Sequence, residues 1–204
     1  MNGSITSNVT LDGGMLGGSG TVGGVSVGSG ATVAPGNSIG TLTVSGNVAF
    51  AAGSTYQVEV NAAGQSDRIV ASGSASITGG TVQVLAENGN YAASTNYTIL
   101  TASGGVTGTF NTVTSNLAFL TPSLAYDSQT VTLSMTRNDN SFGPDNGGSG
   151  SSSGTSIAPT RNQGFIAIAA ERLGVGNPIY DTLISATAAE ARAGFDLLSG
   201  EAHA

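Results

Sequence analysis

The sequence contains no cysteine, no lysine and no tryptophan, and only 8% of its residues are charged. The missing cysteines exclude disulfide bonds and thiolate metal sites, although they do not separate a cytosolic protein from a bacterial secreted one. The missing lysines exclude a Walker-type phosphate loop. Five arginines stand against 12 acidic residues. Because the net charge is −7 and no basic cluster occurs, we expect the chain to bind neither nucleic acid nor an anionic membrane surface.

Long apolar runs are also missing. None approaches the roughly 18 to 20 residues that a membrane helix requires. The first residues lack the basic start and apolar middle of a signal peptide, so any export signal is expected outside this chain. What the sequence has instead is 32 glycines among many Ser, Thr, Ala and Asn residues. This composition favours a long, thin extracellular β-structure over a soluble enzyme.

Short β-branched runs, separated by Gly, Asn, Asp or Ser, extend from about residue 9 to residue 136. Nothing helical interrupts them, which predicts an all-β region. A sandwich, a barrel and a solenoid all fit this pattern. Residues 1–50 favour a solenoid because their strands are very short and glycine stands at nearly every turn. Aromatic residues begin at Phe50, which predicts that residues 51–137 form a wider core that caps the open end of the thin one.

The C-terminal quarter of the chain has a different pattern. Residues 138–160 are a linker by composition, because ordering this Gly/Ser-rich segment would bury nothing in return. Residues 161–204 are predicted to be helical, with a first apolar face made of Phe165, Ile166, Ala169 and Leu173. A second helical stretch starts with Asn177 as N-cap and Pro178 at the first position. Its apolar stripe consists of Ile179, Leu183, Ala186, Ala191, Phe195 and Leu198. We expect little within the chain to cover these faces.

Two enzyme signatures occur within residues 18–30, and both fail on context. The dinucleotide fingerprint is matched by Gly18, Gly20 and Gly23, and the nucleophile elbow by Gly24, Ser26 and Gly28. The fingerprint requires a strand-to-helix junction and an acid about 20 residues later, but the next acid is Glu59. The elbow requires a histidine base, and the single histidine is His203, near the end of the chain. These glycines are therefore predicted to be turn positions.

The remaining polar candidates form no known motif. Asp67 and Arg68 are expected to form a strand-edge ion pair of little energetic value. Asp139 and Asp145 carry oxygen ligands that suit calcium, but their spacing matches no calcium loop and favours a solvated linker. Carboxylates for polysaccharide chemistry would have to come from single strands or turns, at Glu59 and Glu87. We therefore predict no catalytic residue, no metal site, no cofactor and no enzymatic activity.

Two phrases of the sequence resemble the C-terminal passenger region of bacterial autotransporters. One is APGNSIGTL, residues 34–42, within the run of glycine-punctuated strands. The other is FDLLSGEAHA, residues 195–204, which is similar to the linker that precedes the translocator barrel in that family. The resemblance covers residues 14–204 and assigns a junction motif to Phe195, Asp196, Leu198, Ser199, Gly200 and Glu201.

The resemblance implies a right-handed parallel β-helix stem over residues 1–50 and an autochaperone cap over residues 51–137. It further implies a flexible linker over 138–160 and a helical junction over 161–204 that precedes a β-barrel missing from this chain. The implied location is the cell surface or the extracellular space, with attachment to the outer membrane through that barrel. The implied partners are the protein's own upstream coils and the downstream barrel.

The expected function is a non-catalytic one: the segment nucleates and caps β-helix folding during secretion, since adding a coil to an existing stack is cheaper than starting one. The predicted folding core is Tyr56, Val58, Ile69, Val82, Tyr97, Ile99, Phe110, Phe119 and Tyr126. Two alternatives remain open, namely an adhesive or interaction surface and a polysaccharide-processing β-helix enzyme. The helical tail is expected to fray, to self-associate or to pack on the β-part.

Overall fold

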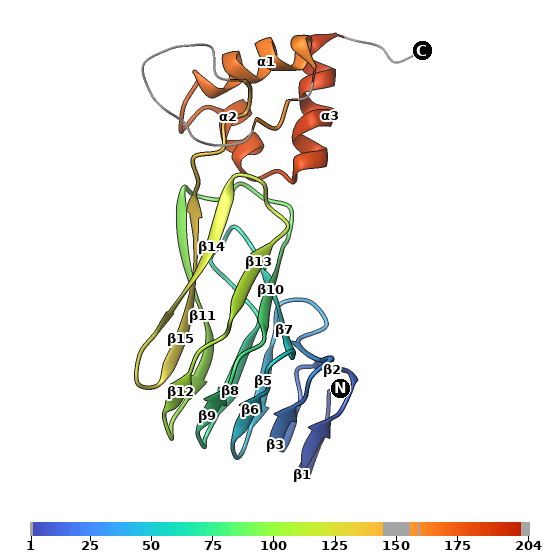
Figure 1. The fold of residues 1–204 in the computed structure, drawn as a ribbon, viewed down its shortest axis with the longest axis vertical. Helices are drawn as coiled ribbons and strands as arrows, with labels where there is room; N and C mark the ends of the chain where they lie inside the picture. The colour runs from blue at the N-terminus through green and yellow to red at the C-terminus, as the bar shows by residue number, and fades with distance from the viewer. Residues whose placement is uncertain (1, 145–155, 159, 201–204) are drawn as a thin grey trace. The chain divides into compact units, whose positions relative to one another are not determined.

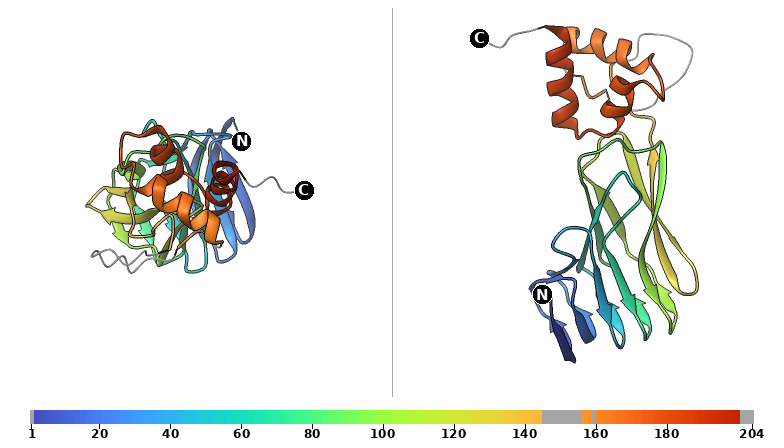
Figure 2. Two further views of the ribbon diagram at one scale, coloured as in Figure 1. Left: turned by 90° about the horizontal axis from the view of Figure 1, so that it is seen from above. Right: turned by 180° about the vertical axis from the view of Figure 1, so that it is seen from behind.

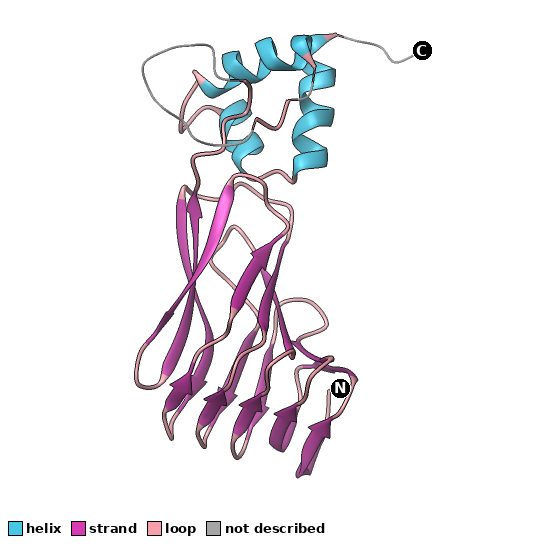
Figure 3. Cartoon of the chain, viewed as in Figure 1, coloured by secondary structure: helices cyan, strands magenta, loops and turns pink. Residues whose placement is uncertain are grey.

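The computed structural model describes residues 2–144, 156–158 and 160–200, and it consists mainly of β-strands followed by helices (Figure 3). The chain divides into two compact units. The β unit comprises Met1–Glu87, Thr95–Ser115 and Pro122–Met135. The helical unit comprises Asn88–Ser94, Asn116–Thr121 and Thr136–Ala204. Part of the predicted linker, together with Asp145, Glu201 and His203, lies outside the described residues.

Within the described ranges the strands form two sheets, labelled in Figure 1. The five-stranded sheet contains β2 (Gly14–Gly18), β4 (Ala31–Pro35), β7 (Thr55–Val60), β10 (Thr81–Ala86) and β13 (Thr112–Ser115). The ten-stranded sheet contains β1 (Ser4–Leu11), β3 (Thr21–Val27), β5 (Thr41–Val44), β6 (Val48–Phe50), β8 (Arg68–Ala71), β9 (Ala75–Ile77), β11 (Ser94–Ala102), β12 (Val106–Gly108), β14 (Leu120–Tyr126) and β15 (Thr130–Arg137).

From β1 to β13 the chain winds back and forth between the two sheets, and every strand lies parallel to its counterpart in the next winding. We call one such winding a coil. Coil length is measured by the register pairs Gly14–Ala31, Thr32–Thr55, Thr55–Thr81 and Thr81–Thr112. Successive coils therefore contain 17, 23, 26 and 31 residues. The coils lengthen towards the C-terminus, which leaves more interior to fill with large side chains.

The interior of the β unit is a set of side-chain ladders that run from coil to coil. Strand burial alternates with period two, as in β7, where every second residue is buried. One ladder joins Val33, Tyr56 and Val82, all with no exposed surface. A second joins Leu42, Ile69 and Leu100, which are equally buried. Because the register is in phase from coil to coil, each apolar residue stacks on another, and this stacking fixes the pairing of the strands.

A column of glycines runs from coil to coil. It starts at Gly23, within β3, and continues through Gly46, Gly73 and Gly104, each at the bend between the two short strands of its coil. A Cβ atom built on Gly46 would lie 2.6 Å from the carbonyl oxygen of Gly23, and one on Gly73 would lie 2.7 Å from the carbonyl carbon of Gly46. Neighbouring backbones therefore approach at this bend more closely than any side chain allows.

The ends of the coil stack differ, as Figure 2 shows with the first coils in blue and the last strands in yellow. In the described part of the chain, β1 pairs with β3 alone, so its other edge carries no strand. At the opposite end, the loop between β14 and β15 meets the last coil. The N–H groups of Val106 and Ala102 donate to the carbonyl oxygens of Ser128 and Gln129, at 2.9 Å and 2.8 Å. This hairpin therefore satisfies polar backbone groups that an open end would leave unpaired.

The helical unit contains α1 (Arg161–Glu171), α2 (Pro178–Ile184) and α3 (Ala188–Ser199). Each helix begins at a capping side chain: Thr160 for α1, Asn177 for α2 and Thr187 for α3. The predicted N-cap at Asn177 and the proline at the first position of α2 are confirmed. Gly200 ends α3 in the left-handed conformation that glycine favours. Among the described residues, the helices are too short or too polar to cross a membrane.

Candidate functional site

Three aromatic rings pack together in the interior of the β unit. The ring centroids of Phe50 and Tyr56 lie 5.6 Å apart, and those of Phe50 and Phe110 lie 5.0 Å apart with an edge-to-face geometry. Tyr56 and Phe110 lie 6.2 Å apart. Such pairs stabilise a core by about 0.5 to 1.5 kcal/mol beyond the area they bury. Phe50 and Tyr56 come from the successive strands β6 and β7, whereas Phe110 follows β12 much later in the chain, so the full cluster forms only when the coils stack.

Tyrosine hydroxyls tie this aromatic cluster to the backbone. The buried Tyr56 hydroxyl donates to the carbonyl oxygen of Ile99, and burial raises its pKa well above the usual value. The Tyr97 hydroxyl donates to the carbonyl oxygen of Asn61 at 2.9 Å. The Tyr126 hydroxyl accepts a hydrogen bond from the Phe110 N–H at 3.0 Å. The first two contacts join β11 to β7 and the residue after it, and the third joins β14 to the segment between β12 and β13, so the polar ends of the rings fix the last coils relative to one another.

The structure places most of the predicted folding core together. Seven of its nine members are buried in the β unit: Tyr56, Val58, Ile69, Val82, Tyr97, Ile99 and Phe110. Tyr126 is half-buried in the same unit. Phe119 is also buried, but in the core of the helical unit. Phe50 belongs to the aromatic cluster of the β unit, but the predicted folding core did not include it, although it was noted as the first aromatic residue of the chain. Whether these residues nucleate folding stays a prediction.

Asp67 is a buried carboxylate, 1% exposed, and does not form the expected ion pair with Arg68. Its Oδ1 accepts a hydrogen bond from the Gly40 N–H at 2.8 Å, and its Oδ2 accepts one from the Glu59 N–H at 2.9 Å. It thereby ties the loop after β4 to β7. Burial raises the pKa of Asp67 to about 6, although the two N–H donors oppose the shift. The prediction of an exposed pair was wrong because the backbone donors satisfy both oxygens inside the fold.

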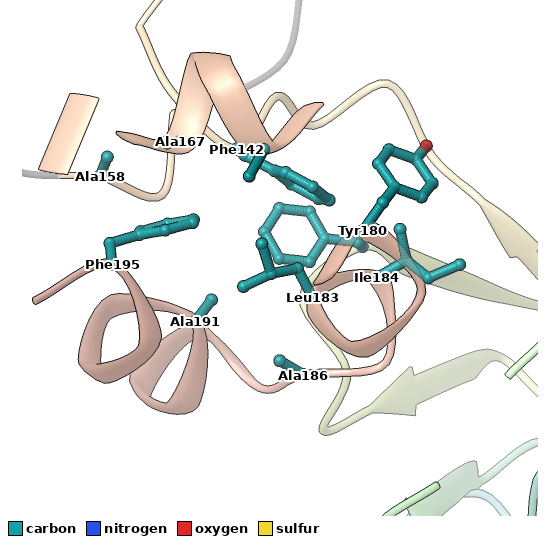
Figure 4. Packing of buried hydrophobic residues seen from close by; sticks show 11 residues of the cluster. Phe142, Ala158, Ala167, Tyr180, Leu183, Ile184, Ala186, Ala191 and Phe195 are labelled. Carbon is teal, nitrogen blue, oxygen red and sulfur yellow. The ribbon is translucent and has the colours of Figure 1, made fainter. Parts of the chain in front are cut away.

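The core of the helical unit surrounds three phenylalanines. The ring centroids of Phe119 and Phe142 lie 4.7 Å apart, and those of Phe142 and Phe195 lie 6.4 Å apart. Figure 4 shows Phe142, Phe195 and Leu183 facing one interior. The rest of this core is Ala158, Ala167, Ala170, Tyr180, Ile184, Ala186 and Ala191. The helices therefore have an apolar core of their own. The expectation that little covers their apolar faces was wrong for Leu183, Ala186, Ala191 and Phe195, whereas Ile179 and Leu198 of the same predicted stripe are exposed.

Arg137 and Glu171 hold the segment that leads into this core. One Nη atom of Arg137 donates to the carbonyl oxygen of Asn140 at 2.9 Å and lies 3.3 Å from Glu171 Oε1. Glu171 Oε2 accepts from the Phe142 N–H at 3.0 Å. The Arg137 guanidinium also lies 5.3 Å from the ring centre of Phe119 and 5.5 Å from that of Phe142. This cation therefore orders residues 138–142 by several weak contacts at once.

The predicted linker contributes more to the fold than its composition indicates. Phe142 and Ala158, both inside residues 138–160, are buried in the helical core. The expectation that ordering this segment buries nothing was therefore wrong at these positions, because the Gly/Ser average hides two apolar residues. The boundaries of the linker stay a prediction.

The apolar face predicted for the first helix was also wrong. Phe165 is 57% exposed and Leu173 is 47% exposed, whereas Gln163, Gly164, Ala167 and Ala170 are buried. A Cβ atom on Gly164 would lie 3.0 Å from Pro144 Cδ. Because Gly164 packs this closely against Pro144, that part of the inward face has no room for a larger side chain, and Phe165 and Leu173 point outwards.

The junction motif is partly structural. Phe195 is fully buried, and Asp196 accepts a hydrogen bond from the buried Gln163 side chain of α1. Ser199 Oγ donates to the Asp196 carbonyl oxygen at 2.8 Å. Leu198 is 48% exposed, which contradicts its place in the predicted stripe. Glu201 lies outside the described residues. The first half of the motif thus fixes α3 against α1.

The glycine motifs of residues 18–30 lie in and between β2, β3 and β4, and no helix follows them. A Cβ atom on Gly23 would lie 2.2 Å from the Thr6 carbonyl oxygen, so this glycine permits β1 to close on β3. Its role is strand packing rather than the turn that was expected. Within the ranges that the structure describes, no group of three or more His, Asp or Glu residues is placed to hold a metal ion.

No protein-family model matches this chain. Two similar proteins are both extracellular serine proteases of Serratia marcescens. The first is 37% identical over 217 residues, which cover 100% of this chain and 20% of that protein. The second is 32% identical over 192 residues, which cover 89% of this chain and 17% of that protein. The chain is thus homologous to a segment of these extracellular proteins and spans about a fifth of their length.

Proposed function

We propose that this chain is the C-terminal passenger segment of a bacterial autotransporter, which seeds and closes a right-handed parallel β-helix outside the cell. Residues 1–50 are the stem, and residues 51–137, which include the β14–β15 hairpin, are the autochaperone cap. The helical unit is the junction towards an outer-membrane barrel. The observation that carries the proposal is the asymmetry of the coil stack, which is open at β1 and closed by hydrogen bonds to the hairpin loop at the other end.

The right-handed winding rests on a general rule. Parallel strands of one sheet that are joined by a crossover are right-handed in about 98% of cases, because the natural twist of the strands favours that path. In this chain each crossover passes through the opposite sheet and returns beside the preceding strand. Side chains from both sheets then share one interior.

The seeding role is supported by the distribution of large side chains. The aromatic cluster and the tyrosine hydroxyl contacts lie between Phe50 and Tyr126, in the longer coils. The coils before Phe50 contain no aromatic residue. A wide, aromatic coil buries more apolar surface for each ordered residue, so it can form before its neighbours stack on it.

The relatives support an extracellular location, since both are named as extracellular proteins. We place the protease activity of those relatives in the larger part of each protein that this chain does not match. The chain itself acts without catalysis, and its partners are the upstream coils and the downstream barrel.

Pulse-labelled hydrogen exchange during refolding of the full chain tests the proposal. Amides of β7, β10 and β11 are expected to gain protection first, and amides of β3 and β4 last. A Phe110→Ala variant should slow the first phase, whereas Met15→Ala, at an exposed position in β2, should leave it unchanged. Early protection of β3 and β4, or an unchanged first phase in the Phe110 variant, would contradict a C-terminal seed.

A second candidate function is an interaction surface on the ten-stranded sheet. A polar groove of about 480 Å³ lies there, lined in part by Asn8, Asn47, Ser74 and Ser76. Small polar side chains in a groove suit hydroxyl-rich glycans or a partner chain. Binding to a glycan array by the folded chain, lost on Ser76→Leu substitution, would favour this function over the seeding role alone.

A further inference from the structure

An exposed bend joins β10 to the buried Tyr91, and it contains the sequence Asn88-Gly89-Asn90. All three residues are exposed, and no hydrogen bond of theirs occurs among the described residues. They form one wall of a cleft of about 300 Å³, whose other wall comes from α2, from Ser185 directly after it, and from α3, including Glu190. The residues on either side of the bend are held: the Glu87 N–H donates to the Val60 carbonyl oxygen at 2.9 Å, and the Tyr91 N–H donates to Ser185 Oγ at 2.8 Å.

We propose that Asn88 is a site of spontaneous deamidation, a covalent modification that alters this cleft. The backbone nitrogen of Gly89 attacks Cγ of Asn88 and loses its proton, and the side-chain nitrogen leaves as ammonia. The resulting succinimide ring then takes up water at one of its two carbonyl groups. The products are aspartate or isoaspartate, so the net change is amide plus water to carboxylic acid plus ammonia.

Two features of the structure favour Asn88 over its neighbour Asn90. Gly89 has no side chain to obstruct the approach of its nitrogen, and this nitrogen is not engaged in a helix or a sheet. The residue after Asn90 is Tyr91, which is 2% exposed and whose nitrogen already donates to Ser185. Asn47, at an exposed bend between β5 and β6, differs from Asn88 because its side chain is held: Asn47 Oδ1 accepts from the Ser74 N–H at 2.9 Å.

The modification would change the cleft in two ways. A new carboxylate at position 88 would face a cleft that Glu190 also lines, which introduces repulsion between like charges. Isoaspartate also adds a methylene group to the backbone, three residues before the Tyr91–Ser185 hydrogen bond. Both changes should loosen the bend from α2.

Ageing of the full folded chain in a mildly alkaline buffer, followed by peptide mapping with mass spectrometry, tests the proposal. Loss of the amide is expected to be at least about tenfold faster at Asn88 than at Asn90, because intramolecular attack slows steeply when the nucleophile cannot approach. Gly89→Val should slow the reaction at Asn88 by a similar factor, and Asn90→Gln should leave it unchanged. In the aged protein, the Tyr91 amide should exchange its hydrogen faster than in fresh protein.

Equal rates at Asn88 and Asn90 in the folded chain would overturn the proposal, as would a Gly89→Val variant that reacts as fast as the unsubstituted chain. Unchanged exchange of the Tyr91 amide after complete reaction at Asn88 would overturn the proposed effect on the cleft.

Discussion

At the scale of single residues, Asp67 is the group that most directly couples this fold to pH. Its carboxylate is buried and near Glu59 and Glu87, which both raise its pKa further. The folded protein therefore binds this proton more tightly than the unfolded chain, in which the usual pKa of 3.8 applies. A proton held more tightly in the folded state stabilises it at low pH.

The free energy of unfolding of the β unit should accordingly contain a component that decreases as the pH rises from about 3.8 to about 6. Urea unfolding across this range, compared between the natural chain and Asp67→Asn, should show that component only in the natural chain. Asp127→Asn is the control. Hydrogen bonds from Thr130 and Gln129 lower the pKa of Asp127, so its own contribution to the free energy of unfolding has the opposite dependence on pH. The component that belongs to Asp67 should therefore persist in this variant. A parallel pH profile for the natural chain and Asp67→Asn would contradict the prediction.

Glycine acts here through two separable effects, positive φ and close packing. Gly30 has φ +78° with no atom near its missing Cβ, and Gly108 has φ +76° with the Ile77 carbonyl oxygen 1.8 Å from that point. Gly30→Ala should cost about 1 kcal/mol from backbone strain alone. Gly108→Ala should cost at least about 3 kcal/mol, because the clash adds to the strain. Equal losses in urea unfolding would show that the close approach carries no cost.

At the scale of elements, α3 depends on its first turn. The Thr187 hydroxyl accepts from the Glu190 N–H at 3.2 Å, and Glu190 Oε2 accepts from the Thr187 N–H at 2.9 Å. Thr187→Ala should therefore destabilise the helical unit by about 1 kcal/mol, whereas Thr187→Ser keeps the hydroxyl and should cost much less. The loss of stability in each variant is measured by thermal unfolding, monitored by circular dichroism at a wavelength that reports helix content. A loss as large for serine as for alanine would show that the cap is not the cause.

At the scale of the whole molecule, the two units have separate cores, and each is assembled from distant parts of the chain. The β core contains Phe110 and the helical core contains Phe142. Truncating a buried phenylalanine to alanine typically costs about 3 to 5 kcal/mol. Phe142→Ala should lower the unfolding midpoint measured from the helix signal more than the midpoint measured from the strand signal. Phe110→Ala should have the reverse effect. Coincident shifts in both variants would indicate a single cooperative unit.

The comparison of sequence with structure follows the same division. The β-region could be predicted because alternation with period two is a local signal, and it correctly identified buried residues such as Val58, Ile69 and Val82. A helix cap is also a local signal: the pair Asn177-Pro178 was enough to predict the start of α2. The inward face of α1 could not be found, because Phe165 and Leu173 satisfy the periodic rule while the packing of Gly164 against Pro144 excludes them. Phe142 was missed for a related reason: a lone aromatic residue in a Gly/Ser-rich segment carries no period.

The sequence by itself therefore determined the β-region, the start of α2 and the absence of disulfides and lysine chemistry, because these depend on neighbouring residues or on composition. Only the tertiary structure decided which coil edge is open and which glycines permit close backbone contact. It alone also showed that the buried Asp67 accepts hydrogen bonds from two distant N–H groups and that Phe142 lies in the helical core. These features arise between residues far apart in the chain, where the deciding quantities are distance and access to water rather than the order of the letters.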